Sequence, residues 1–131
     1  MQLSQHLSEY ISACFTALWV QSHEHEDALT EIAQLCRDQD WRMVVWDINR
    51  GLTIHRQDDG SVDTGTNDPL AAIRSLDALG SQDGASLLVL VNFHRFLQSP
   101  EIIQALAAQI NKGKTNRTFV VILSPIVAYV A

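Results

Sequence analysis

Two histidines separated by one residue stand in the most acidic stretch of the sequence. His23 and His25 flank Glu24, and Glu26 and Asp27 follow them. Histidines at positions i and i+2 do not share a helix face, so this pair could bind a divalent metal only from a loop or a strand. No third histidine stands at a convincing spacing. The sequence therefore favours a solvated helix N-terminus over a metal site.

A second polar group follows the most apolar stretch of the chain. Residues 85–91 carry no charge, and Asn92, His94 and Arg95 come soon after them. Such a run predicts a strand that is buried on both faces, and open α/β folds bind ligands where strands of this kind end. His94 could act there as a general base, but no nucleophile or partner acid is visible. Ser124 lacks the glycine elbow of a catalytic serine, so a loop histidine and a strand terminator are favoured.

Two features that handle phosphate are absent at the places where a P-loop ATPase would have them. The strand that matches residues 85–91 ends in an acid in those enzymes, which positions magnesium and the attacking water. Here Asn92 stands at that position. The first strand-to-helix junction of a P-loop is rich in glycine and carries a lysine, whereas residues 21–27 read QSHEHED. We therefore expect no catalytic residue, no cofactor-binding residue and no metal ligand in this domain.

Composition narrows the class of protein further. The chain has 131 residues, a formal net charge of -6 and 47% hydrophobic residues, which indicates one acidic globular domain. Without a basic stripe a nucleic-acid surface is not expected. No signal-peptide pattern and no membrane-spanning run is visible, so we expect a cytoplasmic protein that does not contact membranes. Cys14 and Cys36 are expected to be reduced thiols in the core.

Apolar runs and helical periodicities alternate along the chain. Strands are expected near residues 14–20, 42–48, 86–92 and 118–123, and helices over residues 2–12, after Ser22, from Asp68 to Leu79, and from Ser99 to about Lys112–Lys114. This alternation predicts a three-layer α/β sandwich with a parallel sheet. Residues 52–67 are polar and rich in glycine. They predict either a mobile loop, the most mobile internal segment, or a small hairpin that turns at Asp59-Gly60.

Two runs carry a resemblance to a known family: Trp46-Asp47-x-x-Arg50-Gly51-Leu52 and Phe93-His94-Arg95-Phe96-Leu97. From about residue 15 to 125 the chain resembles the N-terminal domain of a bacterial and plastid group of AAA-type ATPases. This group is related to a hypothetical chloroplast reading frame of cyanobacteria and algae. The resemblance implies a degenerate P-loop NTPase-like fold placed before a true AAA module.

An AAA core has five strands in the order 5-1-4-3-2. The resemblance therefore implies the order 1-4-3-2 here, with the fifth strand missing. It also implies that residues 1–131 are a single-domain fragment of a longer ATPase. Such a full-length protein would bind ATP and magnesium, and this domain would bind no cofactor of its own.

Two classes of function remain open. The first is a non-catalytic regulatory or recruiting domain whose partners are other proteins or the AAA module of the same chain, with self-association as a further option. The second is a small ligand-binding or enzymatic domain that uses the cleft near Asn92 and His94; the isolated domain is expected not to be an enzyme. An interaction site or vestigial site is expected at His23, His25, Asp47, Arg50, Asn92, His94 and Arg95.

Overall fold

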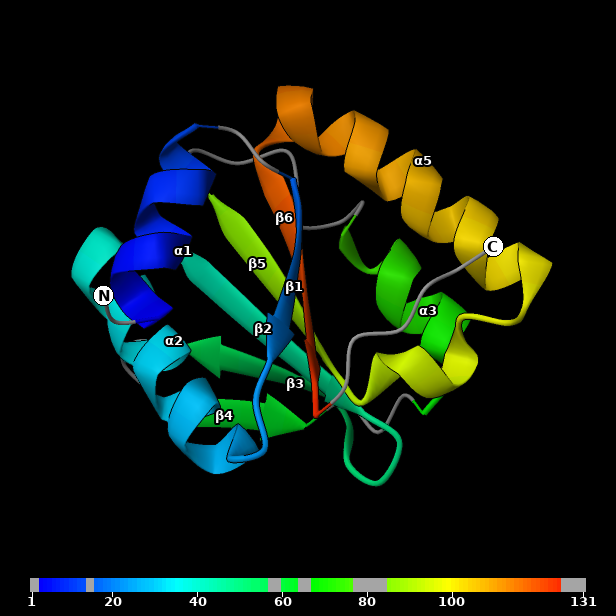
Figure 1. Cartoon of the computed structure of the whole chain (residues 1–131), viewed down its shortest axis with the longest axis horizontal. Helices are drawn as coiled ribbons and strands as arrows, with labels where there is room; N and C mark the ends of the chain where they lie inside the picture. Colours follow the sequence, from blue (N-terminus) through cyan, green and yellow to red (C-terminus); the bar gives the residue numbers. More distant parts are fainter. Residues whose placement is uncertain (1–2, 14–15, 57–59, 64–66, 77–84, 126–131) are drawn as a thin grey trace.

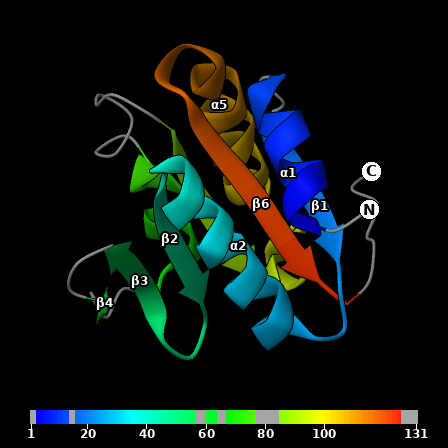
Figure 2. The same ribbon diagram turned by 90° about the vertical axis from the view of Figure 1, so that its left-hand side faces the viewer.

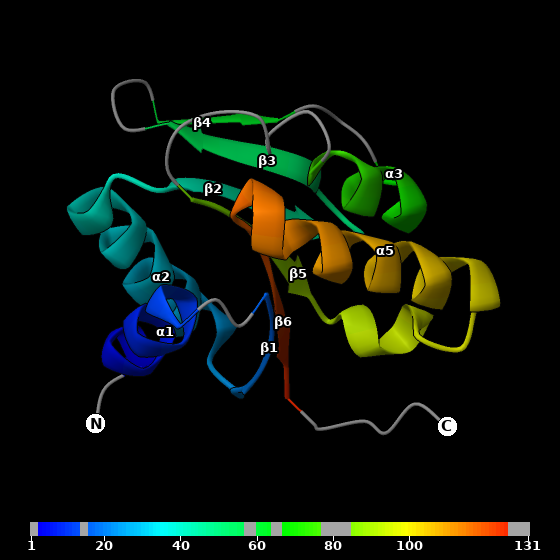
Figure 3. The same cartoon turned by 90° about the horizontal axis from the view of Figure 1, so that it is seen from above.

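The computed structural model describes residues 3–13, 16–56, 60–63, 67–76 and 85–125 (Figure 1). In chain order its elements are α1 (Leu3–Ser12), β1 (Ala17–Gln21), α2 (His25–Gln39), β2 (Arg42–Asp47), β3 (Gly51–Arg56), β4 (Gly60–Asp63), α3 (Pro69–Arg74), β5 (Ser86–Val91), the 3-10 helix η1 (Phe93–Phe96), α5 (Pro100–Asn116) and β6 (Thr118–Ser124). Helices α1 and α2 cover one face of the sheet, and α3 and α5 cover the other (Figure 3). The predicted α/β class is confirmed.

The sheet has six strands in the order β1-β6-β5-β2-β3-β4. Strands β1, β6, β5 and β2 are parallel neighbours, whereas β3 pairs antiparallel with β2 and β4 pairs antiparallel with β3. The predicted sheet of four parallel strands with a missing fifth strand is therefore wrong in its strand number and in its complete order. The two additional strands lie beyond β2, at the edge opposite β1 (Figure 2).

Strands β3 and β4 pair antiparallel, as the second of the two predicted alternatives requires. Strand β3 places Leu52 in the core on the α3 and α5 side, where only 7% of this residue is exposed. The polar composition left a mobile loop and a small hairpin open. The buried Leu52 and the ladder to β2 explain why β3 forms as a strand. Of the predicted turn, Gly60 begins β4 and Asp59 lies outside the described residues.

Strand β5 lies between the two halves of the core, and all six of its residues are buried. Leu87, Val89 and Val91 join the core under α1 and α2, while Leu88 and Leu90 join the core under α3 and α5. Successive side chains of a strand point to opposite faces, which explains this division. The prediction of a strand buried on both faces is confirmed.

The first strand and the second helix begin later than the sequence predicted. Strand β1 spans Ala17–Gln21, and Cys14 of the predicted strand lies outside the described residues. Helix α2 has Glu24 as its N-cap residue, while the hydroxyl of Ser22 accepts a hydrogen bond from the Glu24 amide at 3.2 Å. Ser22 therefore shapes the turn before α2 rather than capping the helix.

Two other helix ends test the sequence signals. The predicted cap at Asp68 is confirmed, since its carboxylate accepts a hydrogen bond from the Leu70 amide at 3.0 Å. Helix α5, however, passes through Gly113 and ends at Asn116, so its predicted end at Lys112–Lys114 is wrong. Arg117, the C-cap residue that follows α5, adopts the left-handed conformation with φ 54°. Among the described residues, no helix is long and apolar enough to cross a membrane.

Candidate functional site

The carboxyl ends of the parallel strands bring together side chains that are far apart in the sequence. Asp47 ends β2, Asn92 follows β5, and Ser124 ends β6. Asn92 has a left-handed backbone with φ 57°, which asparagine tolerates better than most residues, and its amide donates to the Leu123 carbonyl at 2.8 Å. This sharp turn directs the chain from β5 into η1 at the edge of the sheet.

His94 and Ser124 form a hydrogen-bonded pair behind this edge. Ser124 Oγ lies 2.9 Å from His94 Nδ1, and the tautomer of the histidine determines which atom donates. A serine beside a histidine is the arrangement of a nucleophile and its base. Ser124 is fully buried, however, so a substrate would not reach its hydroxyl. The pair fastens η1 to the end of β6, and this agrees with the prediction of a loop histidine and a strand terminator.

Three aromatic rings support the same edge from below. The ring of Trp46 meets the edges of Phe93 and Phe96 at centroid distances of 5.6 Å and 5.5 Å, with near-perpendicular planes. Trp46 and Phe93 are fully buried and Phe96 is partly buried. Edge-to-face packing of this kind is favourable beyond the burial of area. The two runs that carry the family resemblance thus meet in space at this cluster.

A hollow of about 340 Å³ opens at this edge between the ends of β2 and β5. We call it the edge hollow. Its lining comes from the β2–β3 turn and from the turn after β5: Asp47, Ile48, Asn49, Val91, Asn92, Arg95 and Phe96. Ile48 is 49% exposed and presents an apolar side chain at this hollow.

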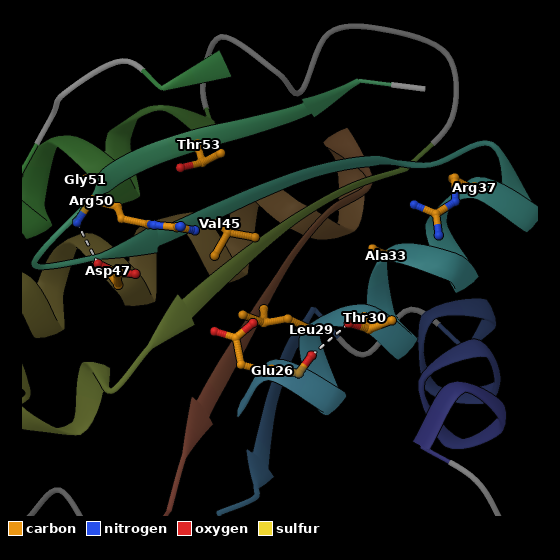
Figure 4. A pocket seen from close by; sticks show the side chains of 10 residues that line it. All are labelled: Glu26, Leu29, Thr30, Ala33, Arg37, Val45, Asp47, Arg50, Gly51 and Thr53. Atoms are coloured by element: carbon orange, nitrogen blue, oxygen red, sulfur yellow. Dashed lines mark hydrogen bonds between the residues drawn. The ribbon is translucent and has the colours of Figure 1, made fainter. Parts of the chain in front are cut away.

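A second hollow, of about 490 Å³, lies on the other side of Asp47 between α2 and the β2–β3 hairpin (Figure 4). We call it the α2 groove. Figure 4 shows Arg50 extending along it from the turn toward Val45, with Arg37 at the far end. Its wall of mixed charge is completed by Glu26, Leu29, Thr30, Ala33, Asp47, Gly51 and Thr53.

Asp47 shapes the turn that separates the two hollows. Its Oδ1 atom accepts hydrogen bonds from the amides of Asn49 at 2.8 Å and Arg50 at 2.7 Å. Gly51 then adopts φ 75°, a conformation that favours glycine. An aspartate that accepts from the following amides is a common way to fix a tight turn. The positions of Ile48 and Arg50 are therefore set by a well-bonded backbone.

The junction between β1 and α2 presents carboxylates where a P-loop presents amides. Glu24 is the N-cap residue of α2, and Glu26 and Asp27 lie in the first turn. The pKa of the Glu24 carboxyl is raised because Asp27 shares a hydrogen bond with it and repels its negative charge. A phosphate approaching this helix end would meet the same repulsion.

The comparisons with known proteins add the family. Residues 3–129 match the family described as the SpoVK-like AAA ATPase, N-terminal domain. The chain belongs to this family. No curated protein and no solved structure gives a significant match. The expectation of an N-terminal domain of an AAA-type ATPase is confirmed, and the finer link to the chloroplast reading frame stays a prediction.

In this SpoVK-like N-terminal domain, the predicted site residues fall into three places. The edge hollow is lined by Asp47, Asn92 and Arg95. His94 lies behind this hollow and is hydrogen-bonded to Ser124. Arg50 lines the α2 groove instead. The remaining two, His23 and His25, line neither hollow.

The β1–α2 junction does not assemble a metal site in the part of the chain that the structure describes, since no group of three or more possible ligands is found there. His25 Nε2 is buried without a hydrogen-bond partner among the described residues. This orphaned atom belongs to a partly exposed side chain and does not point to a ligand by itself.

Sequence reasoning missed the apolar part of the edge hollow. Ile48 and Phe96 line it, but each stands in a stretch that also has polar neighbours and so gave no separate signal. Ser124 and His94 were considered separately in the sequence, although their side chains form a hydrogen bond in the fold. Their pairing depends on the adjacency of β5 and β6, which periodicity along the chain does not reveal.

Proposed function

We propose that this domain regulates an AAA-type ATPase or recruits its protein partners, and that it neither binds nor hydrolyses nucleotide. The observation that carries the proposal is the β1–α2 junction. Glu24, Glu26 and Asp27 occupy the helix end at which a nucleotide-binding fold would receive phosphate. ATP and magnesium then belong to an AAA module elsewhere in a full-length protein.

The arrangement of the parallel strands supports a degenerate P-loop ancestry. Strands β1, β6, β5 and β2 follow one another as strands 1, 4, 3 and 2 do in an AAA core. Asn92 at the end of β5 occupies the position of the acid that handles magnesium. We also propose that the domain is related to the ATPase group with the chloroplast reading frame. We further propose that the protein is cytoplasmic.

The edge of the sheet at β1 supports the recruitment of a protein partner. Among the described residues, β1 pairs with β6 alone and ends the sheet. Its sequence, ALWVQ, contains no charge, proline or glycine, which are the usual protections of an exposed edge. A strand from a partner, from the AAA module or from a second copy would extend the sheet there.

The proposal is tested by comparing three preparations: the full-length ATPase, the same protein without residues 1–131, and residues 1–131 alone. We expect basal ATP hydrolysis in the first two and none in the third. Hydrolysis by residues 1–131, or its complete loss from a folded protein that lacks them, would contradict a purely recruiting or regulatory role.

A small ligand-binding or enzymatic domain is the second candidate function, because the edge hollow lies where open α/β folds bind ligands. His94 is bonded to a buried serine and has no carboxylate partner among the described residues. This favours binding over catalysis. Turnover that is lost on replacing His94, with the fold intact, would favour the enzymatic alternative.

A further inference from the structure

The edge hollow combines one unpaired cation with apolar walls. Arg95 is exposed and, in the described part of the chain, forms no ion pair or side-chain hydrogen bond. The side chain of Asn92 likewise has no hydrogen-bond partner among the described residues. An arginine fork and an amide that lie free at one hollow match the two oxygens of a carboxylate.

The apolar lining of the edge hollow is firmly placed. Val91 is buried, Phe96 is held by Trp46 and Phe93, and Ile48 stands on the turn that Asp47 fixes. Preorganised apolar and arginine side chains are the usual anchors of protein recognition. With a volume of about 340 Å³, the hollow is at the small end of the range for binding pockets.

We propose that the edge hollow binds a carboxylate that adjoins an apolar side chain, as the C-terminus of a partner protein presents it. The inference rests on the proposed recruiting function and names the chemistry of the partner. Arg95 receives the carboxylate, Asn92 donates to it, and Ile48 and Phe96 contact the apolar side chain. Such a ligand offers a carboxylate to the polar side of the hollow and an apolar side chain to its apolar side.

Asp47 lines the same hollow and opposes an anion there. One of its carboxylate oxygens already accepts hydrogen bonds from two backbone amides, so Asp47 mainly stabilises the turn. Asparagine keeps this acceptor and removes the charge. The Asp47→Asn variant should therefore keep the turn and bind a carboxylate more tightly than the unchanged domain does.

The test is an NMR titration of the 15N-labelled 131-residue chain with three probes. N-acetyl-leucine carries the terminal carboxylate and the apolar side chain, N-acetyl-leucinamide lacks only the charge, and the α-amide of N-acetylglutamate carries a side-chain carboxylate. We expect N-acetyl-leucine to shift the amides of Ile48, Asn92 and Arg95 to saturation. The leucinamide should bind about tenfold more weakly or worse, since a charge-assisted contact is lost.

Variants locate the contact. Arg95→Gln should weaken the binding of N-acetyl-leucine by about tenfold. Arg50→Gln is the control: Arg50 lines the α2 groove, so this variant should bind N-acetyl-leucine as the unchanged domain does. A well-dispersed spectrum of each variant shows that it is folded. Equal binding of acid and amide, an unchanged Arg95→Gln variant, or shifts outside the edge hollow would overturn the proposal. Tighter binding of the glutamate probe would overturn the assignment to a chain terminus.

Failure of this inference is distinguishable from failure of the proposed function. Nucleotide is titrated separately from the three probes. Nucleotide binding would contradict the recruiting role whatever the probes do, whereas probes that fail while nucleotide also fails to bind would overturn the carboxylate site alone.

Discussion

Ser124 Oγ lies 2.9 Å from His94 Nδ1 and so joins the end of β6 to the 3-10 helix that follows β5. The two residues are 30 positions apart in the chain. Their bond closes the carboxyl edge behind the edge hollow. A partly buried hydrogen bond in this position should contribute to stability rather than to turnover.

Replacing Ser124 by alanine should lower the free energy of unfolding by about 1 kcal/mol, because the bond is lost and the ring of His94 is left without its partner. Urea titrations of Ser124→Ala, His94→Ala and the double variant measure the coupling between the two side chains. Purely additive effects would show that the contact contributes nothing.

The glycine in helix α5 provides a second stability test. In most helices alanine is about 1 kcal/mol better than glycine. At position 113, however, an added Cβ would overlap the carbonyl oxygen of Thr118 and lie 3.0 Å from the Cβ of Thr16. We expect Gly113→Ala to destabilise the fold by about 1 to 3 kcal/mol, as overpacking does.

The matched control for Gly113→Ala is Ala107→Gly on the exposed side of the same helix, which should cost about 1 kcal/mol through propensity alone. Thermal or urea unfolding measures both. A Gly113→Ala variant that is more stable than the unchanged domain would show that α5 moves away from β6 without cost.

The alkaline limit of stability should depend on Cys36. Burial raises the pKa of this thiol from 9.0 to about 12. The unfolded chain therefore releases the thiol proton at lower pH than the folded chain. The contribution of this neutral thiol to the free energy of unfolding is fully present below pH 9. It is lost as the pH rises from 9 towards 12.

Between pH 8 and pH 10 the unchanged domain should lose about 1 kcal/mol more stability than the Cys36→Ala variant. Urea unfolding of both proteins at the two pH values isolates this contribution, because all other titrating groups are shared. Parallel loss of stability in both proteins would show that the thiol is ionised as easily in the fold as in the unfolded chain.

The open edge of the sheet predicts self-association. In a parallel strand the backbone groups of alternate residues face the same neighbour. The Thr16 carbonyl and the Ser22 amide bond to β6, so the Ala17 amide faces away from it. Ala17→Pro should leave the ladder to β6 intact and weaken pairing between two copies.

Sedimentation velocity over a range of concentrations tests this self-association. We expect the unchanged domain and the control variant Ala17→Ser to form dimers at high concentration, and Ala17→Pro to stay monomeric. A monomer at every concentration, or equal association of all three proteins, would contradict an available β1 edge.

The sequence predicted the four parallel strands because each contains a run of apolar residues that is buried on one or both faces. It did not predict β3 and β4 as definite strands, because the residues from 52 to 67 are mostly polar and contain glycines that also suit a loop. Leu52 and Ile54 are the two large apolar residues of the first of these strands, and Leu52 is buried.

The candidate site was predicted in part. The rule that ligands bind at the carboxyl ends of strands placed Asn92, His94 and Arg95 at this edge, and Asn92 and Arg95 do line its hollow. Asp47, which came from the family resemblance, lines the same hollow. The rule does not say which strands are adjacent. The bond between His94 and Ser124, and the separate position of Arg50 in the α2 groove, follow from the packing of β2, β5 and β6.

The central claim is that the domain does not bind nucleotide, and calorimetric titration of ATP with magnesium into residues 1–131 tests it most directly. A longer protein that carries an AAA module after this domain, titrated under the same conditions, would be the positive control. We expect saturable binding to that longer protein and no binding to the domain, because Glu24, Glu26 and Asp27 lie at the helix end where a P-loop fold would receive phosphate. Saturable binding of ATP to the domain, weakened by His25→Ala or Asn92→Ala, would contradict it.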